Sequence, residues 1–185
     1  QYMAYISSDS VYIDSDTPLN EDSCAQPGSL HGVMHLTREV MLSNAYQGPL
    51  SILRPTLIYG TDDPHNGYGP NRFMRQAKNG EDIMLFGEGE ERRDHVWIED
   101  VAELTCNALC RQSTGTLNIA TGNVVSFREI AEHAKHLFSS KSKVILSKRS
   151  GPMPHNGYRA FDPAVTSTAF PDFNYMPLSE GLHKI

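Results

Sequence analysis

The chain contains 185 residues, of which 39% are hydrophobic and 21% charged, and its formal net charge at pH 7 is −6. This balance indicates a globular domain with a sizeable core, and it argues against a polybasic surface for DNA or RNA. No apolar stretch approaches the 18 residues of a membrane-spanning helix, so we expect neither a nucleic acid nor a membrane as partner.

The first 60 residues predict a strand, a helix and a second strand. Residues 2–8 form an apolar run that ends in hydroxyl side chains, which is typical of a central parallel strand. A loop rich in turn-forming residues covers 14–29. Residues 30–47 then read as an amphipathic helix whose apolar stripe contains Leu30, Val33, Met34, Met41 and Leu42. A second strand begins at Leu50, and this order predicts a parallel sheet covered by helices.

The remaining residues continue the alternation of helices and strands after a long loop at 61–70. We expect helices at 71–79, 99–110, 126–137, 163–169 and 178–184, and strands at 83–86, 94–98, 115–120 and 143–147. Ser126 and Glu129 form a capping-box signature. Cys106 and Cys110 lie one helical turn apart, and we expect them to pack as small hydrophobic residues. With Cys24 they make a sparse, odd set, which suggests a reducing compartment such as the cytoplasm.

Three segments carry polar residues at a characteristic order and spacing: Tyr5-Ile6-Ser7-Ser8-Asp9-Ser10-Val11-Tyr12, Leu53-Arg54-Pro55-Thr56-Leu57-Ile58-Tyr59-Gly60, and Gly87 to Asp100, which includes Arg92-Arg93-Asp94. Together they resemble the extended short-chain dehydrogenase/reductase family of nucleotide-sugar epimerases and dehydratases, over essentially the whole chain. The resemblance implies an α/β fold, namely the C-terminal part of a Rossmann-type parallel sheet interleaved with a small α/β substrate-binding domain. We assign 1–60 and 99–121 to the Rossmann-type domain, and 61–98 and 122–185 to the substrate-binding domain.

One segment of the family pattern is not found in this sequence. No Gly-x-x-Gly-x-x-Gly follows a strand, so the adenosine-diphosphate half of a dinucleotide has no phosphate cradle here. At about 30 residues for each strand–helix–strand unit, we expect roughly 100 residues of the fold to lie outside the chain.

The resemblance gives catalytic roles to Ser8, His31 and His35. Ser8 matches the family's catalytic serine or threonine, which hydrogen-bonds the reacting substrate oxygen at the carboxyl end of a parallel strand. His31 and His35 replace a Tyr-x-x-x-Lys pair, in which the tyrosine is the acid/base and the lysine binds the nicotinamide ribose. Because a histidine titrates near 6.5, His31 could exchange protons at neutral pH without a neighbouring cation. Imidazole reaches less far than a phenol, however, and catalysis requires hydrogen-bond distance.

Further ligand contacts follow from the same resemblance. For the cofactor, NAD or NADP, the matching residues are Ser7, His35, Pro55 and Thr56; for the substrate they are Ser8, Leu57, Asn71, Arg72, Arg93, Arg149 and Arg159. Leu57 replaces an asparagine of the family and cannot donate a hydrogen bond to a sugar nucleotide. Arg93 matches the arginine that pairs with the substrate diphosphate, and a planar guanidinium suits bidentate binding of phosphate oxygens.

These residues imply a nucleoside-diphosphate-sugar epimerase or dehydratase that acts through transient hydride transfer to NAD. One alternative is a catalytically degenerate protein that only binds sugar nucleotides, and another is an NADPH-dependent carbonyl reductase on the same fold. A zinc site at His31 and His35 would need a third ligand, and none is evident, so we expect no metal. A sheet without its first strands leaves an unpaired edge, so we expect a homo-oligomer or association with a missing N-terminal half.

Overall fold

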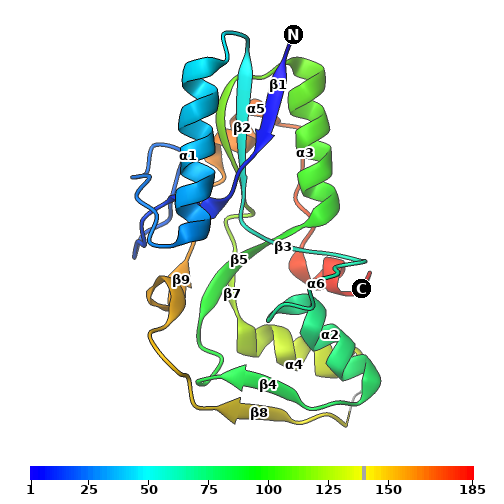
Figure 1. Ribbon diagram of the computed structural model, residues 1–185. Helices are drawn as coiled ribbons and strands as arrows, with labels where there is room; N and C mark the ends of the chain where they lie inside the picture. Colours follow the sequence, from blue (N-terminus) through cyan, green and yellow to red (C-terminus); the bar gives the residue numbers. More distant parts are fainter. Residues whose placement is uncertain (139–140) are drawn as a thin grey trace.

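A computed structural model describes residues 1–138 and 141–185, and Figure 1 shows how the elements are arranged. The helices are η1 (Asp9–Val11), α1 (Leu30–Ala45), α2 (Pro70–Asn79), α3 (Ile98–Arg111), α4 (Phe127–Leu137), η2 (Pro154–Gly157), α5 (Ala164–Ala169) and α6 (Leu178–Leu182). The strands are β1 (Met3–Ile6), β2 (Leu50–Pro55), β3 (Leu57–Tyr59), β4 (Ile83–Phe86), β5 (Arg92–Trp97), β6 (Gly115–Ile119), β7 (Val124–Ser126), β8 (Val144–Ser147) and β9 (Tyr158–Arg159).

A parallel sheet in the order β1-β2-β6 occupies one end of the molecule, and Figure 1 shows α1 and α3 flanking it. Its strands are joined through helices, as a parallel sheet requires. On the side of α3, buried apolar residues of the sheet and the helix form a core that includes Leu53, Val101, Leu104 and Leu117. The expected α/β fold with a parallel Rossmann-type sheet is confirmed.

The other end of the molecule contains smaller sheets and two packed helices. Strand β5 pairs with β3, β7 and β9, while β4 and β8 form a separate parallel pair. Helices α2 and α4 pack against these strands around a second core, which includes Phe73, Ile83, Leu85, Trp97 and Phe127. The sequence did not reveal β3, β7 and β9, because each has only two or three residues and shows no alternation of its own.

Most predicted elements are present within two residues of the expected bounds, and α4 begins with the expected capping box. The first strand is shorter than the expected 2–8, because Ser8 caps the short helix η1 and so ends the extended segment. Among the described residues, no helix is both long and apolar enough to span a bilayer. The division of the chain into a Rossmann-type domain and a substrate-binding domain stays a prediction.

The prediction that Cys106 and Cys110 are packed inside is wrong, because both side chains are exposed. Helix α3 buries Val101, Leu104 and Ala108, which repeat every three to four residues and set the face toward the sheet. Positions 106 and 110 lie on the other side of that helix.

The apolar stripe of α1 also lies away from the sheet. Leu30, Val33, Met34 and Met41 are exposed, as is Val40, while Gly32 and Glu39 are the buried residues of this helix. The side of α1 that packs on β1 is therefore largely polar, and its outer face is apolar.

Candidate functional site

Alternate side chains of β1 point toward α1, as the two-residue period of a strand requires. The Tyr5 hydroxyl lies 3.2 Å from Nδ1 of His35, and the Ser7 hydroxyl donates a hydrogen bond to the carboxylate of Glu39. His35 and Glu39 are four residues apart and so lie on one face of the helix. Strand and helix are thus joined by two polar contacts at the carboxyl end of the sheet, where open α/β folds bind ligands.

Glu39 is the centre of a buried polar network. Arg54 on β2 donates to both of its carboxylate oxygens, at 3.0 and 2.6 Å, and also to the Tyr12 hydroxyl at 2.7 Å. Glu39, Arg54 and Ser7 are all buried, and a buried charge of this kind is stable only when it is paired and hydrogen-bonded. The predicted cofactor residue Ser7 is therefore engaged within the protein, and its contact with a cofactor stays a prediction.

Ser8 lies at the end of the same strand segment, next to the first turn of α1. Its Oγ accepts hydrogen bonds from the backbone N–H of Ser10 at 3.2 Å and from the Ser10 hydroxyl at 2.9 Å. Gly32 in α1 approaches so closely that a Cβ there would come 2.1 Å from the backbone oxygen of Ser10. The structure therefore brings the turn that carries His31 against the loop that carries Ser8.

The two predicted histidines contact each other in an edge-to-face arrangement with ring centroids 4.6 Å apart. His31 is exposed, and His35 is half-buried between His31 and Tyr5. Burial, with smaller contributions from the charges of His31 and Arg38, lowers the pKa of His35 below its ordinary value. His35 is consequently neutral at pH 7 and presents one nitrogen as a donor and the other as an acceptor.

A second group of predicted residues lines a cavity of about 360 Å³ at the start of β5. Arg93 on β5 and Arg149 after β8 supply its positive charges, and its remaining wall includes Leu57, Tyr68, Phe86 and Phe127. The rings of Tyr68 and Phe86 lie 4.8 Å apart, and those of Tyr68 and Phe127 lie 4.7 Å apart. The cavity therefore combines an aromatic wall with two guanidinium groups.

Glu91 lies between the two arginines of this cavity. One carboxylate oxygen is 3.0 Å from Nη1 of Arg93, and the other is 3.5 Å from Nη1 of Arg149. The Nε atoms of both arginines are buried without a hydrogen-bond partner among the described residues. Buried donors are normally satisfied, so these two N–H groups lack the partner that such groups usually have. One carboxylate leaves the trio with a formal charge of +1.

Arg159 lies apart from this cavity wall, in a buried cluster that connects β9 with η1. Its guanidinium is 3.1 Å from Oδ2 of Asp9 and 3.3 Å from Oδ1 of Asp14, and it also donates to backbone oxygens of Asp9 and Ile13. Its register partner across the strand pair is Arg93. Arg159 thus links the Ser8 loop to the strand of the arginine cavity, and a substrate contact of its own stays a prediction.

The other predicted contacts are spread over the chain. Pro55 and Thr56 are buried at the end of β2, where the Thr56 hydroxyl donates to the backbone oxygen of Asp94 at 3.3 Å. Both side-chain polar atoms of Asn71 bond to the backbone of Gly60, and Arg72 beside it is half-buried.

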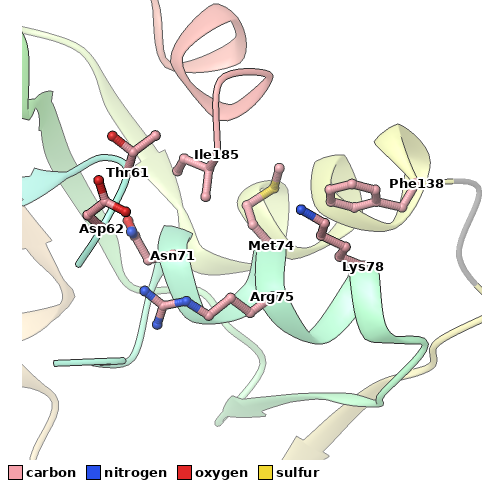
Figure 2. A pocket seen from close by; sticks show the side chains of 8 residues that line it. All are labelled: Thr61, Asp62, Asn71, Met74, Arg75, Lys78, Phe138 and Ile185. Carbon is pink, nitrogen blue, oxygen red and sulfur yellow. The ribbon is translucent and has the colours of Figure 1, made fainter. Parts of the chain in front are cut away.

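Asn71 faces a second cavity, which Figure 2 shows beside α2 and which has a volume of about 310 Å³. Its wall is formed by Thr61, Asp62, Asn71, Met74, Arg75, Lys78, Phe138 and Ile185. Of the residues predicted to contact a ligand, only Asn71 lines this cavity; Arg93, Arg149 and Leu57 line the one at β5.

Sequence reasoning missed Tyr5 and Glu39 as parts of these sites. Tyr5 reads as one more aromatic residue of a core strand. The spacing of these residues was the available signal, because positions 5 and 7, two apart at the end of an extended segment, face positions 35 and 39 of one helix.

The fold and the comparisons with known proteins define the class of protein. Solved structures of Rossmann-type sugar-nucleotide enzymes superpose over 98% of the chain, including UDP-glucuronic acid 4-epimerase from Bacillus cereus in complex with UDP-glucuronic acid and NAD, at a TM-score of 0.85, 25% identity and 59% coverage of that enzyme. The family described as NAD dependent epimerase/dehydratase matches residues 1–120. The chain belongs to this family.

Two relatives illustrate how far the sequences have diverged, since each is identical to this chain at less than a third of the aligned residues. UDP-N-acetyl-alpha-D-glucosaminuronate decarboxylase of Bacillus cytotoxicus is 29% identical over 163 residues, which are 82% of this chain and 50% of that enzyme. dTDP-L-rhamnose 4-epimerase of Burkholderia thailandensis is 31% identical over 139 residues, which are 70% of this chain and 38% of that enzyme. The chain thus spans half or less of the length of these two relatives.

Proposed function

We propose that this chain forms the substrate-binding part of a nucleoside-diphosphate-sugar epimerase or dehydratase. The observation that carries the proposal is the arginine cavity, in which the guanidinium groups of Arg93 and Arg149 lie on either side of Glu91 beside an aromatic wall. Two guanidinium groups on one side of a cavity suit the adjacent phosphates of a diphosphate, because each forms short, charge-assisted hydrogen bonds. Family membership and the sugar-nucleotide ligand of the Bacillus cereus epimerase support the same assignment.

In this proposal the remaining substrate contacts follow the geometry of the cavity. Leu57 and the aromatic side chains face apolar surfaces of the nucleoside and sugar. Asn71, Arg72 and Arg159 do not line this cavity, so any contact of theirs with the substrate is made by a part of it that extends beyond the cavity. Ser8 orients the reacting sugar hydroxyl, because its Oγ lies at the carboxyl end of the parallel sheet next to the His31 turn. His31 exchanges the proton of that hydroxyl in place of the family's tyrosine.

The residues of this chain fit the nicotinamide end of NAD. His35 Nε2 has no hydrogen-bond partner among the described residues, so it can donate to a ribose hydroxyl, and Pro55 ends the neighbouring strand. The hydroxyls of Ser7 and Thr56 bond within the protein and fit this role less well. When bound, NAD supplies the hydride acceptor of the reaction, and its pyrophosphate would be held by a glycine-rich segment outside these 185 residues.

A non-catalytic sugar-nucleotide-binding protein is the second candidate. The observation that favours it is the exposed position of His31, whose side chain makes no hydrogen bond among the described residues. Such a protein would keep the arginine cavity and lack turnover. A third candidate is an NADPH-dependent carbonyl reductase on the same fold. Leu57 favours this function, because it replaces the family asparagine that contacts the sugar nucleotide.

Binding of phosphate-containing ligands tests the proposal. We expect calorimetric titration to show saturable binding of UDP-glucuronic acid and UDP, weaker binding of UMP, and no binding of uridine. Arg93→Ala should weaken binding of UDP-glucuronic acid by about 1.5–3 kcal/mol, the value of a hydrogen bond to a charged group. Arg92→Ala is the matched control, because Arg92 is exposed and adjacent in the strand. Equal affinities of wild type, Arg93→Ala and Arg92→Ala would contradict the assignment.

A further inference from the structure

Tyr5 makes a contact that the proposed roles of Ser8, His31 and His35 do not use. Its hydroxyl lies 3.2 Å from Nδ1 of His35, and this is its one hydrogen bond among the described residues. The phenol sits on β1, whose backbone is paired with β2 at Tyr5 and Ile52, so its position is fixed by the sheet. A group fixed in this way can impose an orientation on the histidine it contacts.

The contact can have either of two proton arrangements, with opposite results for the free nitrogen of His35. If the phenol donates to Nδ1, the imidazole proton is on Nε2, and Nε2 is a hydrogen-bond donor. If Nδ1–H donates to the phenol oxygen, Nε2 is an acceptor, and the phenolic proton has no acceptor among the described residues. The first arrangement pairs the stronger donor, the phenolic O–H, with the stronger acceptor, the unprotonated imidazole nitrogen, so the chemistry favours it.

The surroundings of His35 keep the ring neutral. Only a neutral imidazole has two tautomers, so both proton arrangements are available to it. His31 and Arg38 on α1 disfavour a positive charge on it, and Glu39 favours one, but burial has the largest effect and lowers the pKa. The β1 side contributes the uncharged phenol of Tyr5.

We propose that Tyr5 is a positioning residue, which donates to Nδ1 of His35 and thereby presents Nε2–H as the donor toward a ligand. The class of ligand group it fits is a hydroxyl oxygen, such as that of a ribose, because a neutral N–H donor suits an uncharged acceptor. This inference rests on the proposed function, since the ligand contact of His35 belongs to it. A neutral imidazole becomes a directed donor through the hydrogen bond at its other nitrogen.

Long-range ¹H–¹⁵N NMR of the histidine-labelled chain tests the positioning without any ligand or activity. In wild type we expect Nδ1 of His35 to resonate as an unprotonated nitrogen and Nε2 as a protonated one. In Tyr5→Phe both signals should move toward intermediate values, because the two tautomers then interconvert. Tyr2→Phe is the control, since Tyr2 immediately precedes the same strand and donates to the Ser113 backbone oxygen instead of to a histidine. A protonated Nδ1 in wild type, or an unchanged tautomer in Tyr5→Phe, would overturn the proposal.

A second measurement separates the positioning from the ligand contact. In the longer protein that includes the dinucleotide-binding half, Tyr5→Phe should weaken NAD binding about two- to tenfold, as expected for one neutral hydrogen bond, while Tyr2→Phe leaves it unchanged. The affinity for UDP-glucuronic acid should not change in either variant. The expected tautomer together with unaltered NAD affinity would overturn the claim that Nε2 serves the ligand. Loss of UDP-glucuronic acid binding in wild type would instead refute the proposed function.

Discussion

Glu91 illustrates how single residues set the properties of this site. A buried carboxylate between two guanidinium groups keeps them apart and aligned, and it cancels one of their two charges. In the proposed function the cavity attracts a dianionic diphosphate, and the Glu91 carboxylate spares the fold two uncompensated buried charges, which would be costly. Glu39 and Arg54 are a second buried pair of opposite charges. Each group compensates the charge of the other, so this pair has no net charge for a ligand to neutralise.

His31 is the residue on which catalysis depends in the proposed enzyme. In the longer protein, His31→Ala should abolish turnover of a nucleotide sugar and leave its binding nearly unchanged, because the lost interaction would be made in the transition state. Steady-state kinetics together with calorimetric titration measure the two effects separately. Tyr2→Phe provides the control for an aromatic change away from the site. If neither wild type nor His31→Ala turns over any nucleotide sugar while both bind one, the binding-protein function is the correct one.

His95 gives the folded chain a dependence on pH. Complete burial, with a smaller effect of Arg93, lowers its pKa to about 3, while an unfolded chain would protonate it near 6.5. The unfolded state thus binds the extra proton first, so the stability contributed by His95 is full above about pH 6.5 and is lost as the pH falls toward 3. Asp94, whose pKa is raised to about 6 by burial, acts in the opposite direction below pH 6.

Replacement of this histidine isolates its contribution. His95→Phe should flatten the fall in unfolding free energy between pH 6.5 and 4 relative to wild type, because phenylalanine does not titrate. Urea denaturation at several pH values measures this difference, with His65→Phe, a change in an exposed loop, as the control. Parallel pH profiles of wild type and His95→Phe would show that burial of His95 does not govern acid stability.

At the scale of elements, the packing of α1 on η1 depends on one residue without a side chain. A Cβ at Gly32 would meet the backbone oxygen of Ser10, which cannot move as a flexible side chain could. Gly32→Ala should therefore destabilise the chain by about 1–3 kcal/mol, although alanine favours a helix elsewhere. Gly28→Ala, which meets no atom within 4 Å, is the control. Thermal denaturation compares the two, and equal melting temperatures would refute the close approach.

The sequence predicted the elements better than it predicted their faces. The capping box at Ser126 and the strand at 83–86 were found because local chemistry determines them. The buried face of α1 was not, since the apolar residues that dominate its pattern lie outside, and the residues that contact β1 are polar. Similarly, Cys106 and Cys110 match an apolar helix but fall on its exposed side. Which face is buried depends on partners far away in the sequence.

The outer face of α1 and the free edge of β1 are the features of the whole molecule that most suggest a partner. Leu30, Met34 and Met41 are exposed on one helix, and within residues 1–138 and 141–185 β1 pairs with β2 alone. We therefore expect the isolated chain to self-associate or to bind the dinucleotide half of the protein. Met34→Glu with Met41→Glu should shift sedimentation toward the monomer, whereas Leu109→Glu, at an exposed position of α3, should not. A monodisperse wild-type monomer would contradict this expectation.

We propose that these 185 residues hold the sugar-nucleotide site and lack the phosphate cradle of the dinucleotide site, and parallel calorimetric titrations with the two ligands distinguish these properties. UDP-glucuronic acid should saturate the purified chain, with affinity reduced in Arg93→Ala, while NAD should give no saturable signal at millimolar concentration because no glycine-rich phosphate cradle is part of the sequence. Micromolar binding of NAD would contradict the absence of a phosphate cradle, and failure of UDP-glucuronic acid to bind a folded chain would contradict the sugar-nucleotide site.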